Sequence, residues 1–199
     1  MAASVNLSFS SARTLRSLLL ILSVLCLPHA IAAPAPPPNF AVEQVLSEIS
    51  QPISMRFLPD GRLLLLQKKG GVLIAAVDSV PGSYEQYFDL SSPQHPDGLN
   101  AEQERGLLDI AIDPDFPNEP YIYLLYTPAQ GPNGPRMRVS RFTHVENAGD
   151  LSSRGSIGSE LILWEDSQGY DSCCHFGGGL DFGPDGNLWL SIGDHFQGS

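Results

Sequence analysis

The chain has 199 residues, of which 42% are hydrophobic and 17% charged, so it can bury a core and is not disordered throughout. Its 11 basic and 22 acidic residues give a net charge of −11, which excludes the basic surface that nucleic acid or a polybasic membrane contact requires. The 19 glycines and 17 prolines favour frequent turns and therefore many short strands.

The N-terminus has the three parts of a secretory signal peptide. Two arginines precede an apolar run of ten residues at 18–27, and the small-residue cleavage pattern Ala-Ile-Ala follows at 30–32. A membrane-spanning helix needs about 20 apolar residues, so this run is too short. We predict a signal peptide over 1–32, an extracellular or periplasmic location, and no transmembrane segment after cleavage. Residues 33–38 are predicted to be a proline-rich spacer.

Three segments of the remaining chain share a hairpin pattern in which an apolar strand, a Pro-Asp turn and a second apolar strand follow one another. These segments are 55–66, 107–126 and 180–192. Gly61 and Gly186 can supply a positive φ in two of the turns. Further strands are predicted at 71–77, 137–142 and 160–164, a glycine- and serine-rich insertion at 149–159, and 42–49 is the sole helix candidate.

The spacing of the hairpins indicates a β-propeller. Equivalent positions Phe57, Ile112 and Phe182 are 55 and 70 residues apart, and small-sheet repeats of about 40–50 residues are typical of propeller blades. The fold class is therefore predicted to be all-β. Because closed propellers have about 4–8 blades, residues 39–199 are expected to be roughly three blades of a longer protein, that is, a fragment.

The densest group of potentially reactive side chains lies at 171–194, with the sequence DSCCHFGGGLDFGPDGNLWLSIGD. Within it, a neutral His175 imidazole could accept a proton near neutral pH, and the glycines that follow would let a flat ring approach the backbone. The simpler interpretation is that His175 only bonds backbone at the start of a strand.

This segment and a second one, ERGLLDIAIDPDF at 104–116, together resemble the soluble glucose and sorbosone dehydrogenase family. Its members are six-bladed propellers that oxidise sugars with pyrroloquinoline quinone (PQQ), and the resemblance covers about residues 45–199. It implies that His175 is the general base, with Glu104 and Cys174 beside the sugar or the cofactor. It also implies a sugar substrate, an unidentified electron acceptor and calcium, with the calcium ligands and the groups that grip the quinone mostly beyond residue 199.

A second function remains open, because Glu104 stands where the sugar dehydrogenases often carry glutamine. The sequence Glu-Arg-Gly-Leu-Leu is also similar to hedgehog-interacting propellers, which bind other molecules without catalysis. This resemblance implies an extracellular propeller that binds a protein or a glycan. In a third interpretation, Glu104 and Arg105 are merely a solvated pair of charges on a loop.

Cys173 and Cys174 are adjacent and would be the only cysteines after cleavage of the signal peptide. They could form a disulfide with each other, stay reduced, or pair with other chains. Metal binding by Cys-Cys-His is disfavoured because neighbouring side chains on a strand point to opposite faces. Five aspartates lack the pattern of a calcium loop and are predicted to be turn residues: Asp113, Asp115, Asp181, Asp185 and Asp194. The other histidines, His29, His95, His144 and His195, show no partner pattern.

Overall fold

The computed structural model describes residues 36–78, 80–129, 135–147, 150–167, 169 and 173–195. The predicted signal peptide at 1–32 and the first residues of the predicted spacer lie outside the described residues. The chain divides into two compact units, 1–42 and 43–199, and every described strand belongs to the second. No helix among the described residues could cross a membrane.

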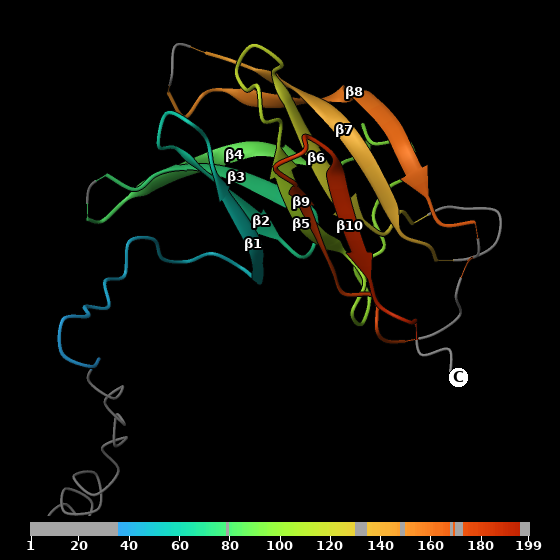
Figure 1. Cartoon of the computed structure of the whole chain (residues 1–199), viewed down its shortest axis with the longest axis horizontal. Coiled ribbons are helices and arrows are strands. Elements are labelled where there is room, and N and C mark those ends of the chain that lie inside the picture. The colour runs from blue at the N-terminus through green and yellow to red at the C-terminus, as the bar shows by residue number, and fades with distance from the viewer. Residues whose placement is uncertain are drawn as a thin grey trace, which may run out of the picture. The chain divides into compact units, whose positions relative to one another are not determined.

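The described residues form three antiparallel sheets in which neighbouring strands follow each other along the chain (Figure 1). The first sheet contains β1 (Pro52–Phe57), β2 (Leu63–Gln67), β3 (Gly71–Ala76) and β4 (Ser83–Asp89). The second contains β5 (Leu107–Ile112), β6 (Tyr121–Tyr126), β7 (Arg138–Val145) and β8 (Arg154–Glu165), and the third contains β9 (Gly178–Phe182) and β10 (Leu188–Ile192). Successive meandering sheets of this kind are propeller blades, so the prediction of an all-β partial propeller is confirmed.

The β1–β2 and β9–β10 hairpins are closed by the same turn chemistry. In each turn the aspartate accepts a hydrogen bond from the backbone N–H two residues later, at 3.0 Å for Asp60 and 3.1 Å for Asp185. The glycine that follows has a positive φ, +92° for Gly61 and +77° for Gly186. A left-handed residue at that position suits glycine, which is why Pro-Asp-Gly recurs at these turns.

The core lies between the sheets rather than beneath one of them. Along β6, Ile122, Leu124 and Tyr126 enter a buried cluster shared with the first sheet. The intervening Tyr123 and Leu125 enter a second cluster shared with the third sheet. Alternate residues of a strand face opposite sides, so a strand between two other blades needs apolar side chains on both faces. This accounts for the unbroken apolar sequence of β6.

Asp109 on β5 joins the innermost strands of all three sheets. Its carboxylate accepts hydrogen bonds from Ser54 Oγ on β1 at 2.5 Å and from the Leu180 backbone N–H on β9 at 2.7 Å. Arg56 on β1 adds an ion pair at 3.4 Å, and only 11% of the Asp109 side chain is exposed. The carboxylate therefore fixes β9, and with it the segment that carries His175, against the first two sheets.

One expectation about local structure is wrong. The helix candidate at 42–49 is not helical, and its residues from Glu43 onward line an apolar cleft of about 770 Å³ on the first sheet, with Met55 and Phe57 opposite. The Val45 carbonyl accepts a hydrogen bond from the Gly82 N–H at 2.8 Å instead of bonding within a helix.

The second half of the predicted insertion at 149–159 lies in a strand, since Arg154 to Ser159 belong to β8. Gly155 is required there for packing, since a Cβ at this position would lie 2.2 Å from Phe88 Cδ1.

Candidate active site

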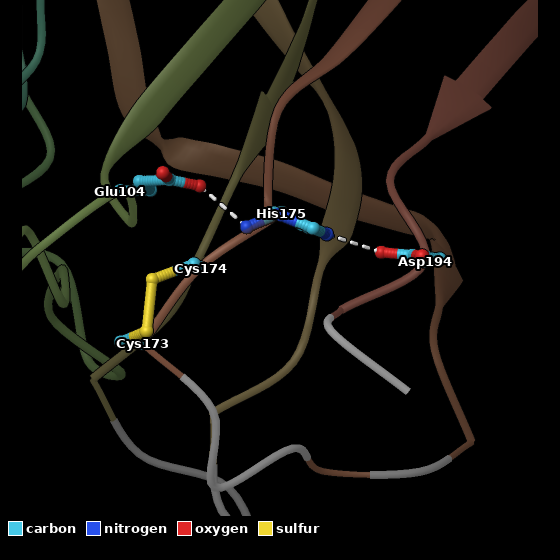
Figure 2. The surroundings of a disulfide bond; sticks show 5 residues. All are labelled: Glu104, Cys173, Cys174, His175 and Asp194. Atoms are coloured by element: carbon cyan, nitrogen blue, oxygen red, sulfur yellow. Dashed lines mark hydrogen bonds and ion pairs between the residues drawn. A yellow bond between two sulfur atoms is a disulfide. The ribbon is translucent and has the colours of Figure 1, made fainter. Parts of the chain in front are cut away.

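The residues around His175 come from three separate parts of the chain (Figure 2). Glu104 lies shortly before β5, His175 shortly before β9, and Asp194 just after β10. Because β9 and β10 are antiparallel and Gly178 pairs with Ile192, the start of β9 and the end of β10 meet at one edge. This pairing brings His175 and Asp194 together across 19 residues of sequence.

The imidazole of His175 is bonded to the carboxylate of Asp194. The Nδ1–Oδ1 distance is 2.5 Å, and 48% of the His175 side chain and 66% of the Asp194 side chain are exposed. In a neutral imidazole whose Nδ1–H is donated to a carboxylate, the lone pair is on Nε2. In that tautomer Nε2 is the ring nitrogen that can accept a proton, and about half of the side chain is exposed. Sequence reasoning had assigned Asp194 to a turn and missed this contact.

The backbone of His175 has a left-handed conformation, with φ of +63°. Its N–H is donated to Glu104 Oε2, and its carbonyl accepts the His195 N–H at 3.3 Å. A Cβ at Gly193 would lie 2.0 Å from the His175 carbonyl oxygen, so only glycine allows the two segments to approach this closely. Gly193 thereby places Asp194 within reach of the imidazole.

A disulfide joins Cys173 and Cys174 immediately before His175 (Figure 2). Cys173 is exposed and Cys174 half-buried. The sequence left open whether the two cysteines bond each other, stay reduced or pair with other chains, and the structure contains the bond between them. The described residues hold no group of three or more His, Cys, Asp or Glu side chains that could bind a metal ion.

Three stacked side chains, those of Arg105, Phe176 and His195, lie next to the site. The buried Phe176 ring lies 4.8 Å from the His195 ring, with an angle of 19° between the planes, and the Arg105 guanidinium lies 5.0 Å from the Phe176 centroid. His195 Nε2 lies 3.3 Å from Met137 Sδ, and burial lowers the pKa of His195. This effect of burial outweighs that of the Asp166 carboxylate, whose Oδ2 lies 4.0 Å from His195 Nδ1. Neither Phe176 nor His195 carried a sequence signal for this role.

A further interpretation, which concerns charged residues, is wrong. Glu104 and Arg105 are not simply a solvated pair, because Glu104 contacts His175 while Arg105 is buried against Phe176. Among the described histidines that show no partner pattern in the sequence, His144 and His95 have side-chain partners. His144 contacts Tyr87 OH at 2.8 Å, and His95 contacts Glu160 at 3.2 Å.

Comparison with known proteins identifies relatives of both predicted kinds. Residues 49–199 match the family model described as Glucose / Sorbosone dehydrogenase. The chain is 30% identical to Hedgehog-interacting protein of Homo sapiens, covering 78% of this chain and 22% of that protein. It is 29% identical to Quinoprotein glucose dehydrogenase B of Acinetobacter calcoaceticus, covering 78% of this chain and 31% of that enzyme.

A solved structure of an oxidoreductase described as a glucose dehydrogenase, from Thermus thermophilus, superimposes with a TM-score of 0.62. The two share 28% identity, and the match covers 78% of this chain and 41% of the Thermus protein. The chain thus spans well under half the length of these relatives. Since the family model matches most of its residues, the chain belongs to the glucose/sorbosone dehydrogenase family.

Proposed function

We propose that this chain carries the general base of a quinoprotein that oxidises an aldose sugar at C1, with hydride transfer to PQQ. The observation that carries the proposal is the half-exposed His175 imidazole, bonded at Nδ1 to Asp194. Membership of the family and similarity to a quinoprotein glucose dehydrogenase support the substrate class and the cofactor.

His175 would take the proton of the anomeric hydroxyl on Nε2. The Asp194 carboxylate, 2.5 Å from Nδ1, orients the ring and stabilises the positive charge that develops on it. As the O–H bond breaks, the C1–H bond releases a hydride and the sugar becomes a lactone. When bound, PQQ would supply the hydride acceptor.

The residues beside His175 fit one wall of such a site. A Cβ at Gly177 would meet nothing within 4 Å, so the chain next to His175 borders open space that a planar ring can approach. Cys174 and Gly177 would line this space, together with His175. The family resemblance assigns the groups that grip the quinone, and most calcium ligands, to positions beyond residue 199, so no calcium ligand is assigned in this chain.

We further propose that residues 1–32 direct secretion and that 33–38 form a spacer before the propeller at 39–199. The order of a basic segment, an apolar run and a small-residue site supports this. N-terminal sequencing of the exported protein should begin within two residues of Ala33. An intact Met1 on cytosolic protein would contradict the proposal.

A non-catalytic propeller that binds a protein or a glycan is the second candidate. One support is the 30% identity to Hedgehog-interacting protein. The other is that the Glu104 carboxylate accepts a hydrogen bond from the His175 backbone N–H. In the sugar dehydrogenases, glutamine often stands at this position.

One experiment separates the two candidates. The protein expressed from the complete reading frame is incubated with PQQ and calcium, and quinone binding and dye-linked oxidation of a panel of aldoses are measured. The enzyme proposal predicts both activities. If the protein neither binds quinone nor oxidises any aldose, the binding candidate replaces the enzyme.

A further inference from the structure

We propose that Glu104 and the Cys173–Cys174 disulfide are positioning residues that together hold the His175 main chain, so that reduction of the disulfide moves the imidazole away from Asp194. The structural part of this inference is independent of the proposed function, and only its catalytic consequence rests on that function.

We call Glu104 and the Cys173–Cys174 disulfide together the clamp. Its first part is the carboxylate of Glu104, which accepts a hydrogen bond from the His175 backbone N–H across 71 residues of sequence. The loop that carries Glu104 is itself fixed. The Leu107 N–H is donated to the Lys68 carbonyl at 2.9 Å, and the Arg105 N–H to the Glu102 carbonyl at 3.0 Å. Because the backbone on both sides of Glu104 is anchored, its carboxylate extends from a fixed point of the chain, and a bond to a charged acceptor is stronger than one to a neutral group.

The conformation of His175 explains why an acceptor is needed. A φ of +63° is in the left-handed region, which is unfavourable for a residue with a side chain. Such a conformation persists when surrounding contacts fix it. Here the N–H bonds Glu104, the carbonyl bonds the His195 N–H at 3.3 Å, and the ring bonds Asp194 at 2.5 Å.

The second part of the clamp is the disulfide. It joins consecutive residues and closes a small ring through the Cys173–Cys174 peptide, which limits ψ of Cys173 and φ of Cys174. The carbonyl of Cys174 belongs to the same peptide group as the His175 N–H. The ring holds the Cys174 Cα, to which this peptide is attached, while Glu104 binds the N–H at the other end of the peptide. Figure 2 shows the disulfide on the Glu104 side of His175.

Cys173 is exposed, so a small thiol reductant can reach the bond. Dithiothreitol would transfer two electrons to the disulfide and become a cyclic disulfide itself. The Cys173–Cys174 S–S bond breaks, and each sulfur ends as a thiol. The freed cysteines no longer restrict the peptide, and His175 can leave the left-handed conformation.

The test records the histidine ring signals of the unliganded protein, expressed from its complete reading frame, by NMR. Mass spectrometry first checks that the peptide containing both cysteines is two hydrogens lighter before reduction. On adding dithiothreitol, the His175 ring signals should shift and the contact with Asp194 should be lost. The His95 and His144 signals should stay in place and report an intact fold. Glu104→Ala should produce the same change, Glu104→Gln a smaller one, and the exposed neighbour Glu102→Ala none.

The double variant Cys173→Ser/Cys174→Ser should resemble the reduced wild type and should not respond to dithiothreitol. If the His175 signals are unchanged both on reduction and in Glu104→Ala, the clamp does not exist. In an active enzyme, either change should lower kcat by as much as about 10²-fold with KM nearly unchanged, because the base is misplaced rather than removed. Shifted His175 signals in a protein without quinone binding would support the clamp and reject the proposed enzyme.

Discussion

His175 and His144 are both bonded to carboxylates, at 2.5 Å from Asp194 and 2.7 Å from Glu146, but they lie in opposite environments. The His144 side chain is 1% exposed, and its other ring nitrogen contacts Tyr87 OH at 2.8 Å. The His175 side chain is 48% exposed, on a left-handed backbone at the edge of the third sheet. The comparison shows that a histidine–carboxylate pair by itself does not identify a reactive site. Access from solvent, and a main chain held in an unfavourable conformation, distinguish the candidate base from the structural pair.

Replacing each histidine by alanine gives the sharpest contrast. His175→Ala should lower aldose oxidation by about 10²–10⁴-fold while leaving stability and quinone binding nearly unchanged. His144→Ala should instead cost about 2 kcal/mol of unfolding free energy, because it leaves a cavity and the buried Tyr87 hydroxyl unpaired. Dye-linked rates and urea unfolding of both variants check the contrast. An active His175→Ala enzyme would show that another residue is the base.

The buried pair of His95 and Glu160 should control stability at acid pH. Burial disfavours the charged form of Glu160, but hydrogen bonds from His95, Tyr126 and Ser140 hold its pKa at about 2. The folded pKa is below the unfolded one, so the carboxylate stabilises the fold above the usual glutamate range and this contribution disappears as pH falls toward 2.

We expect a loss of roughly 3 kcal/mol between pH 5 and pH 2 from this group. Urea unfolding at a series of pH values measures it. In Glu160→Gln the free energy of unfolding should fall less steeply between pH 5 and pH 2 than in the wild type, whereas the substitution Glu102→Gln at an exposed position should leave this fall unchanged. An equally steep fall in Glu160→Gln would assign the acid sensitivity to other carboxylates.

Asp109→Ala tests the junction of the three sheets. The variant leaves the Leu180 N–H without its carboxylate partner and removes the partner of Arg56, and a buried donor left unpaired costs about 2 kcal/mol. Asp181→Ala is a matched control, because that exposed carboxylate only accepts the N–H of the next residue. Equal unfolding midpoints for the two variants would reject a special role for Asp109.

The smallest effect is expected at the turn glycines. A Cβ at Gly186 would meet nothing within 4 Å, so Gly186→Ala should cost only the backbone penalty of its +77° φ, about 1 kcal/mol. Gly193 has a normal φ, but a Cβ there would collide with the His175 carbonyl oxygen. Gly193→Ala should therefore displace Asp194 and affect the site more than the free energy of unfolding. Thermal melts and the NMR signals of His175 would separate the two effects.

The fold could be predicted where local chemistry decides it. Pro-Asp-Gly turns between apolar runs identified the hairpins around Gly61 and Gly186, and their spacing indicated blades. The sequence of β4 is too polar at its start for such a signal, and its Tyr87 and Phe88 are buried in a cluster that the first and second sheets share. Gly155 lies in the segment predicted as a glycine- and serine-rich insertion, and the sequence does not show that a side chain there would collide with Phe88.

The site was predictable only in part for a related reason. His175, Cys174 and Glu104 were found by family resemblance, and the structure brings all three to one place. The bond between His175 and Asp194 depends on the register of β9 with β10, which the sequence does not specify. The stack of Arg105, Phe176 and His195 joins segments about 70 and 20 residues apart and follows no local pattern.

The carboxylate of Asp109 has a consequence for how the molecule unfolds. In repeat architectures each unit contacts its neighbours, and units can lose structure one at a time. Here a side chain of the middle sheet binds Ser54 of the first sheet and Leu180 of the third with its two oxygens. Opening either outer sheet weakens the anchor of the other, so this shared contact couples the three sheets and favours a single cooperative melting transition over stepwise loss.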